Sequence, residues 1–114
     1  MEKTDKLYLL WTSGEKITFD EMVFMYALNS IKRHWWKEVT LIIWGASAHL
    51  VETDQEVRNK LKVLFDAGVQ ISACKGCADN LKVTDLLEKL GVEVKYWGVP
   101  LTELLHADEK ILTI

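Results

Sequence analysis

The sequence predicts an α/β protein built on a parallel sheet, and two observations carry this prediction. Short apolar runs alternate about five times with segments whose apolar residues recur at helical spacing. The connections between these segments are short, and no repeat or linker interrupts them. Such alternation places helices between strands that run in the same direction. We therefore expect one domain that spans residues 1–114.

The first half of the chain contains two of the predicted strands and two helices. Leu7–Trp11 and Val39–Trp44 are continuous apolar runs, which is typical of strands covered on both faces. A helix is predicted to begin with Thr18 as its N-cap and to run to about residue 32. A second helix is predicted to begin at Thr53 and to end at Gly68.

The second half supplies three more strands. Val69–Ala73 alternates apolar with small or polar residues, and it delivers the chain to Cys74. A polar segment follows this strand. The remaining predicted elements are, in order, a short helix within Leu81–Leu90, a strand at Val92–Trp97, a short helix from Leu101 to about His106 and a closing strand at Ile111–Ile114.

Five strands with helices on both faces form a three-layer structure. At this size the simplest arrangement is the flavodoxin-like one, with a mostly parallel sheet in the strand order 2-1-3-4-5. In that order the first and third strands are neighbours, and ligands bind beyond their carboxyl ends. The loop Thr12-Ser13-Gly14 and the loop that begins at Cys74 would then flank the same crevice.

Composition and charge narrow the class of partner. A chain of 114 residues buries roughly 65% of its unfolded surface, so it needs no disulfide for stability. The net charge is -3, and lysines alternate with carboxylates without a basic stripe, which argues against direct nucleic-acid binding. The segment Met1–Lys6 does not resemble a signal peptide, and no apolar stretch is long enough for a membrane span. We expect a cytoplasmic protein with reduced cysteines.

Cys74 and Cys77 are the candidate catalytic residues. Cys74 follows a strand, where backbone N–H groups and the cation of Lys75 favour a thiolate and Gly76 permits close approach of a ligand. The alternative is that Cys74 is a small buried apolar residue. Cys77 completes a Cys-Lys-Gly-Cys spacing that can close a disulfide ring, although it could equally be a helix residue without a role. A thioredoxin-type site fits poorly, because Pro100 follows the fourth strand and precedes a helix.

Other residues could contribute to substrate binding. His49 follows the second strand and could reach the crevice as an acid, a base or an orienting group, although an exposed loop histidine explains it as well. The candidate substrate-binding residues are Thr12, Ser13, Gly14, Lys75, Gly76 and His49. The three histidines lack metal-ligand spacing, and no glycine-rich phosphate-binding motif is present. We therefore expect neither a metal nor a cofactor.

Three of the five tryptophans end predicted strands. Trp11, Trp44 and Trp97 should lie at the carboxyl edge of the sheet, beside Cys74. Core packing could explain each ring separately. Together they predict an apolar rim suited to a pocket or, more simply, to a subunit interface.

Several segments together resemble a known family. They are Gly68–Cys74, Lys75–Asp79, Leu90–Tyr96 and Gly98–Glu103. These segments resemble the single-domain DsrE/DsrF-like proteins over nearly the whole chain. The resemblance implies a flavodoxin-like subunit that assembles into trimers or hexamers. It also implies a sulfur relay, in which the cysteine at the position of Cys74 accepts a persulfide from a donor protein and passes it to an acceptor.

The sequence therefore favours a persulfide carrier, or a protein similar to sulfurtransferases, in which Cys74 is the accepting thiol. Two alternatives remain. The chain could be a non-catalytic assembly or regulatory subunit of the same fold, or a dithiol redox protein that uses Cys74 and Cys77. In a relay protein, Cys77 could also resolve a persulfide on Cys74 as a disulfide.

Overall fold

A computed structural model describes residues 5–114, so part of the charged N-terminal segment lies outside the described residues. Within this range, no helix is both long and apolar enough to cross a membrane. The elements follow one another in the order β1 (Lys6–Trp11), α1 (Lys16–Thr18), η1 (Phe19–Phe24), α2 (Met25–Lys32), β2 (Glu38–Ile43), α3 (Ala46–Thr53), α4 (Gln55–Ala67), β3 (Gln70–Cys74), α5 (Lys75–Asn80), α6 (Thr84–Lys89), β4 (Glu93–Lys95), α7 (Gly98–His106) and β5 (Lys110–Thr113).

The five strands form one sheet in which every pair of neighbours is parallel. This confirms the α/β class, the five strands and the helices on both faces. The order is β4-β3-β2-β1-β5, so the predicted order 2-1-3-4-5 was wrong. The reason lies in β2, in which four of the six residues are buried, including the consecutive run Leu41–Ile43. A strand covered on both faces needs a neighbour on each side, and β2 has β1 and β3.

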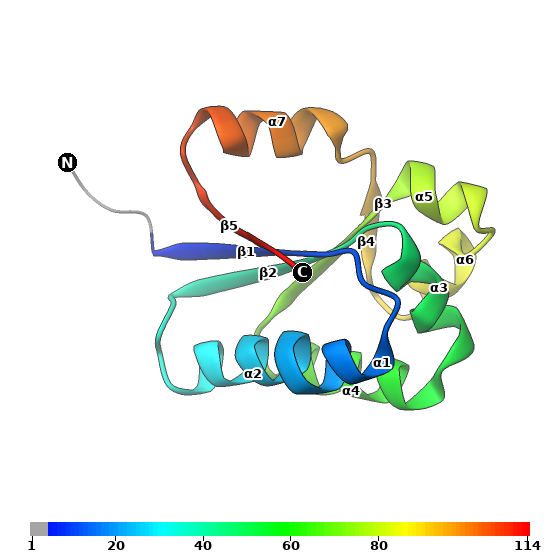
Figure 1. Cartoon of the computed structure of the whole chain (residues 1–114), viewed down its shortest axis with the longest axis horizontal. Coiled ribbons are helices and arrows are strands. Elements are labelled where there is room, and N and C mark those ends of the chain that lie inside the picture. The colour runs from blue at the N-terminus through cyan, green and yellow to red at the C-terminus, as the bar shows by residue number, and fades with distance from the viewer. Residues whose placement is uncertain (1–4) are drawn as a thin grey trace.

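The two faces of the sheet are covered unequally. Helices α1, α2 and α4 lie on one face, whereas α7 alone lies on the opposite face (Figure 1). Alternate residues of the central strands, such as Leu9, Leu41 and Ile71, belong to the large core. Ile42, Cys74 and Trp97 form a separate, smaller cluster. Because side chains alternate along a strand, this smaller cluster belongs to the α7 face.

The helix boundaries differ from the predicted ones for local reasons. The first helix begins at Lys16, so Thr18 lies inside the helix instead of capping it, and a π-helical segment, η1, interrupts the α-helical pattern. Thr53 ends α3, where its hydroxyl donates to the carbonyl oxygen of His49 at 3.1 Å. Asp54 caps α4 by accepting from the N–H of Val57 at 3.1 Å. The stop at Gly68 is confirmed.

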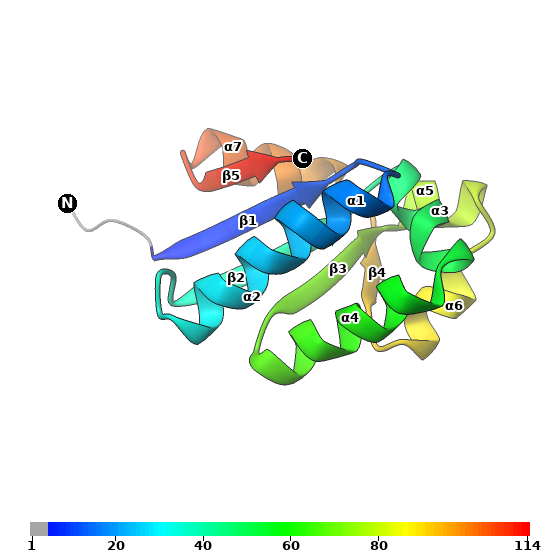
Figure 2. The same cartoon turned by 60° about the horizontal axis from the view of Figure 1, so that its bottom comes forward.

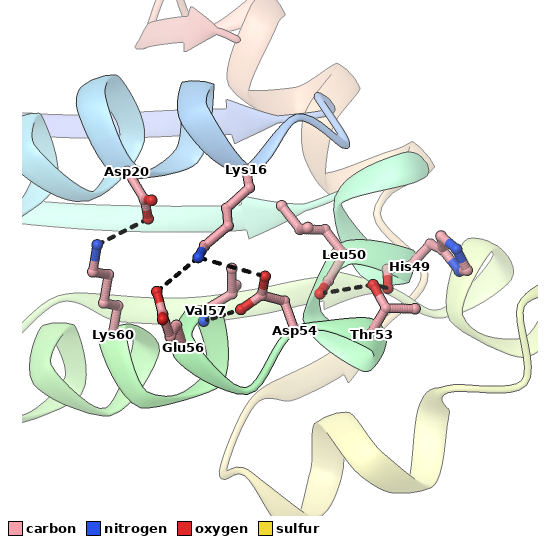
Figure 3. A network of polar contacts seen from close by, with 9 residues as sticks. All are labelled: Lys16, Asp20, His49, Leu50, Thr53, Asp54, Glu56, Val57 and Lys60. Atoms are coloured by element: carbon pink, nitrogen blue, oxygen red, sulfur yellow. Dashed lines mark hydrogen bonds and ion pairs between the residues drawn. The ribbon is translucent and has the colours of Figure 1, made fainter.

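Ion pairs join α4 to the first helical segments. Figure 2 shows α2 and α4 on the same face of the sheet, in front of the strands in this view. Lys16 reaches Glu56 at 2.7 Å, and Lys60 reaches Asp20 at 2.9 Å (Figure 3). These pairs are partly exposed, and surface ion pairs contribute little stability.

We predict that Leu41→Ala lowers the free energy of unfolding by about 2–5 kcal/mol, because it leaves a cavity in a fully buried site. Leu112→Ala is the matched control, since Leu112 lies on the edge strand β5 and is 38% exposed. Its cost should be less than about 1 kcal/mol. Urea denaturation followed by circular dichroism measures both values. Equal losses would contradict the unequal burial of the two strands.

Candidate functional site

The two cysteines meet where β3 turns into α5. Cys74 is the last residue of β3 and the N-cap of α5, with extended backbone angles of φ -71° and ψ 116°. Cys77 is then the third residue of the helix. A side chain at the N-cap and one at the third helical position lie on the same side of the first turn, as in a capping box. The local fold therefore brings the two thiols together, and both are unpaired by disulfide bonds.

The burial of the two thiols differs. Cys74 is only 8% exposed and clusters with Ile42 and Trp97. Cys77 is half-buried and packs against the same cluster, as does Trp44. Cys74 thus lies in an apolar environment but is not completely closed off from solvent, and Cys77 is the more accessible of the two.

The surroundings of Cys77 raise its pKa above the ordinary value of a cysteine. Burial of the thiol is the largest cause, and the adjacent thiol of Cys74 adds to it, whereas the backbone of Gly45 lowers the pKa. Gly45 has φ 73° and ψ -129°, a conformation that glycine adopts without strain. The loop after β2 therefore brings a backbone group next to the Cys77 sulfur.

The cation expected beside Cys74 is directed elsewhere. The Nζ atom of Lys75 lies 3.0 Å from the carboxylate of Asp79 and 5.8 Å from the centre of the Tyr96 ring. The hydroxyl of Thr84 donates to Asp79, and together with Lys75 it lowers the pKa of that carboxyl group. The charge of Lys75 is thus largely neutralised by Asp79, and the apolar cluster dominates the environment of Cys74.

The Thr12-Ser13-Gly14 loop follows a strand that is not a neighbour of β3. Because β2 lies between β1 and β3, the ends of those two strands are about 10 Å apart. The N–H and hydroxyl of Thr12 both donate to the carbonyl oxygen of Ile114, at 2.6 and 3.0 Å. Gly14 lies against the start of α3, where an added Cβ would be 3.2 Å from that of Ala46. The expected pairing of β1 with β3 was therefore wrong. A role for this loop in the site stays a prediction, since Gly14 borders Ala46, the residue after Gly45.

The remaining sequence candidates fall in two places. A Cβ on Gly76 would lie 4.0 Å from the Cys74 sulfur, so Gly76 borders the thiol. His49 is exposed on α3 rather than in a loop, and Figure 3 shows its ring pointing away from the ion pairs of Lys16. Lys75 and Gly76 are next to Cys74 in the chain and begin α5, whereas a role for His49 stays a prediction.

The tryptophans divide between the two faces of the sheet. Trp11 is fully buried in the large core, with its ring centre 4.7 Å from that of Phe19, so it is not part of a rim beside Cys74. Trp44 and Trp97 do pack in the cluster that contains Cys74. The predicted apolar environment is therefore made by two of the three rings.

Trp97 also borders a groove that the sequence did not reveal. This groove has a volume of about 840 Å³ and runs between α7 and the sheet, where Tyr8, Ser72 and Lys95 line it. The Nε1–H of Trp97 donates to the Ser72 hydroxyl at 2.8 Å, and Lys95 Nζ lies 4.6 Å from the centre of the Trp97 ring. Cys74 is not among the residues that line this groove, so the groove and the cysteine pair are separate features of the structure.

The arrangement defines a class of protein: a parallel α/β domain with a reduced, partly buried pair of thiols at a strand-to-helix junction. Such a pair can act as a nucleophile toward sulfur or can close a disulfide. Among residues 5–114, no group of three or more His, Cys, Asp or Glu side chains is placed to hold a metal ion.

Comparison with solved structures shows the family. The chain is 45% identical to the conserved protein of unknown function BT1422 from Bacteroides thetaiotaomicron, over 96% of this chain and 95% of that one, with a TM-score of 0.94. It therefore belongs to the same family as BT1422. Two more distant structures share the fold. They are YchN from E. coli (16% identity, 98% and 100% coverage, TM-score 0.72) and MTH1491, of unknown function, from Methanobacterium thermoautotrophicum (15%, 98% and 100%, 0.74). No protein-family model and no curated protein matches the chain.

We predict that Cys77 is alkylated by iodoacetamide with an apparent pKa above that of a cysteine in an unstructured peptide. The variant Cys74→Ala should lower this pKa, because it removes one of the groups that raise it, but burial should keep it above the peptide value. Alkylation rates between pH 6 and about 11, followed by peptide mass mapping, measure both values. A Cys77 pKa unchanged by Cys74→Ala would contradict the proximity of the two thiols.

Proposed function

We propose that this chain is a sulfur carrier of the DsrE/DsrF-like type, similar to sulfurtransferases, in which Cys74 accepts a sulfane sulfur. The observation that supports this most directly is the position of Cys74 at the carboxyl end of β3, in an apolar cluster that still leaves the residue 8% exposed. Ligands of parallel α/β sheets bind at this end of the strands. The sequence resemblance to DsrE/DsrF-like proteins points to the same cysteine.

The proposed reaction is an exchange between thiols. The Cys74 thiolate attacks the outer sulfur of a donor persulfide, so that a bond forms between these two sulfur atoms and the donor leaves as a thiolate. The product is a persulfide on Cys74. An acceptor thiolate then attacks the outer sulfur in the same way, which regenerates the Cys74 thiolate. Each step requires only a deprotonated thiol and access to the sulfur.

The apolar cluster supports the carrier role. Ile42 and Trp97 pack beside Cys74 and limit the water and the large molecules that can reach a sulfur held there. Cys77, the neighbouring thiol, has a raised pKa and is therefore largely protonated at neutral pH. The packing of Ile42 and Trp97 lengthens the lifetime of a bound persulfide, and the raised pKa of Cys77 keeps that thiol from competing strongly for the donor. We place this chemistry in the cytoplasm, where donor and acceptor proteins keep their thiols reduced.

We further propose that the protein acts as a homotrimer or hexamer that assembles through α7. No residue of this nine-residue helix is buried, although it contains Val99, Leu101, Leu104 and Leu105. Val99 is 70% exposed and Leu105 is 57% exposed. A helix that leaves large apolar side chains such as Val99 and Leu105 exposed is typical of a subunit interface. A second copy of the chain is the occupant that the family resemblance suggests.

We predict that Cys77→Ser gains one sulfur atom on Cys74 when it is treated with glutathione persulfide. The matched variant Cys74→Ser retains Cys77 and should be labelled at least about tenfold more slowly, because a protonated thiol is a poor nucleophile. Intact mass spectrometry and peptide mapping measure the added sulfur. Equal labelling of the two variants, or no labelling of Cys77→Ser, defeats the assignment of Cys74 and leaves a passive assembly subunit as the better explanation.

The assembly prediction concerns Leu105. Leu105→Glu should shift the protein from a trimer or hexamer of the 13.1 kDa chain to a monomer, because it puts a charge on the uncovered side of α7. Val63→Glu, an equivalent change at an exposed residue of α4, should leave the assembly intact. Light scattering coupled to size-exclusion chromatography measures the mass. A monomeric parent protein, or two variants that behave alike, argues against α7 as the interface.

A further inference from the structure

We propose that Cys77 resolves a persulfide on Cys74, so that a cargo left without an acceptor is released as hydrosulfide and the pair closes as a disulfide. This inference rests on the proposed sulfur-carrier function. It gives Cys77 a role that the carrier mechanism does not need.

The geometry of the first turn of α5 carries the inference. Cys74 is the N-cap and Cys77 the third helical residue, so their side chains lie on the same side of the turn. Residues three apart on a helix have Cβ atoms about 5–6 Å apart, whereas a disulfide needs about 4 Å. A contraction of roughly 1–2 Å in this turn therefore closes the bond. Gly76 lies between the cysteines and eases that adjustment.

The packing around the pair favours the internal thiol over an external one. Cys74 and Cys77 belong to the same apolar cluster, and Ile42 and Trp97 cover much of Cys74. The inner sulfur of a persulfide, which is the Cys74 Sγ atom, is therefore hard for a bulky thiol to reach. Cys77 needs no diffusion to reach it, because it is already beside it.

The proposed step balances in atoms and charge. The Cys77 thiolate attacks the Cys74 Sγ atom of the persulfide, the bond between that atom and the outer sulfur breaks, and hydrosulfide leaves with the electron pair. The product is the Cys74–Cys77 disulfide. A low-molecular-weight thiol such as glutathione, in two successive exchanges, reduces this disulfide and becomes oxidised itself. The dithiol is then ready to accept sulfur again.

The test compares the masses of wild-type protein and Cys77→Ser after both have been loaded with sulfur. Wild-type protein is loaded with a slight excess of glutathione persulfide, freed of the reagent by rapid desalting and incubated without an acceptor. It should lose its added sulfur, release one equivalent of hydrosulfide and end with two hydrogens fewer than the reduced chain. Cys77→Ser should keep the added sulfur and release hydrosulfide on the order of 100-fold more slowly. Monobromobimane trapping measures the hydrosulfide, and intact mass spectrometry measures the protein.

The results distinguish failure of the resolving role of Cys77 from failure of the carrier function of Cys74. If Cys77→Ser takes up sulfur and wild-type protein holds it equally long, the resolving role of Cys77 is wrong and the carrier function stands. If Cys77→Ser takes up no sulfur while its circular dichroism matches that of wild type, both are wrong. Peptide mapping of wild-type protein supplies a test that needs no variant, because a disulfide between Cys74 and Cys77 must accompany the released hydrosulfide.

Discussion

The burial of β2 on both faces of the sheet determines the rest of the structure. Leu41 and Ile43 enter the large core, and Ile42 enters the smaller cluster on the opposite face, so this strand needs a neighbour on either side. It has β1 and β3, with continuous register to each. From β1 the chain therefore crosses the sheet in one direction, through β2 and β3 to the edge strand β4. Helix α7 then leads back to β5, which forms the opposite edge beside β1. The strand order also sets the end of β3, and hence Cys74, next to the loop that contains Gly45.

The sequence predicted the architecture well because apolar runs and helical spacing are strong local signals. All five strands lie where Leu7–Trp11 and its counterparts indicated, and Gly68 ends α4 in a left-handed conformation as expected. The strand order was not predicted correctly, because it depends on which strands pair. The spacing of apolar residues locates each strand but does not specify its partners. Helices α3 (Ala46–Thr53) and α5 (Lys75–Asn80) were missed because small residues such as Ala46, Ser47, Gly76 and Ala78 leave these segments with little apolar spacing.

The candidate site was predictable in part. Cys74 and Cys77 could be identified because a strand end followed by a Cys-x-x-Cys spacing is a local pattern. The contribution of Gly45 could not, since it comes from a loop about 30 residues earlier that becomes a neighbour only through the β2–β3 pairing. The Thr12-Ser13-Gly14 loop was assigned to the site because β1 was expected to pair with β3. In the structure β2 lies between these two strands. Lys75 was assigned by proximity in sequence, and its partner Asp79 lies one turn further along the same helix.

The unequal covering of the sheet bears on motion as well as on packing. The face that carries α1, α2 and α4 holds the large core, whereas α7 rests on its face through half-buried side chains alone. Segments with few buried apolar contacts open at a lower free energy than the global transition, and their amides exchange with solvent sooner. In the isolated chain, we therefore expect α7 to open locally while the main core stays intact. Because Leu101 and Leu104 of this helix pack against the cluster that contains Cys74, we expect such opening to expose the Cys74 sulfur to solvent.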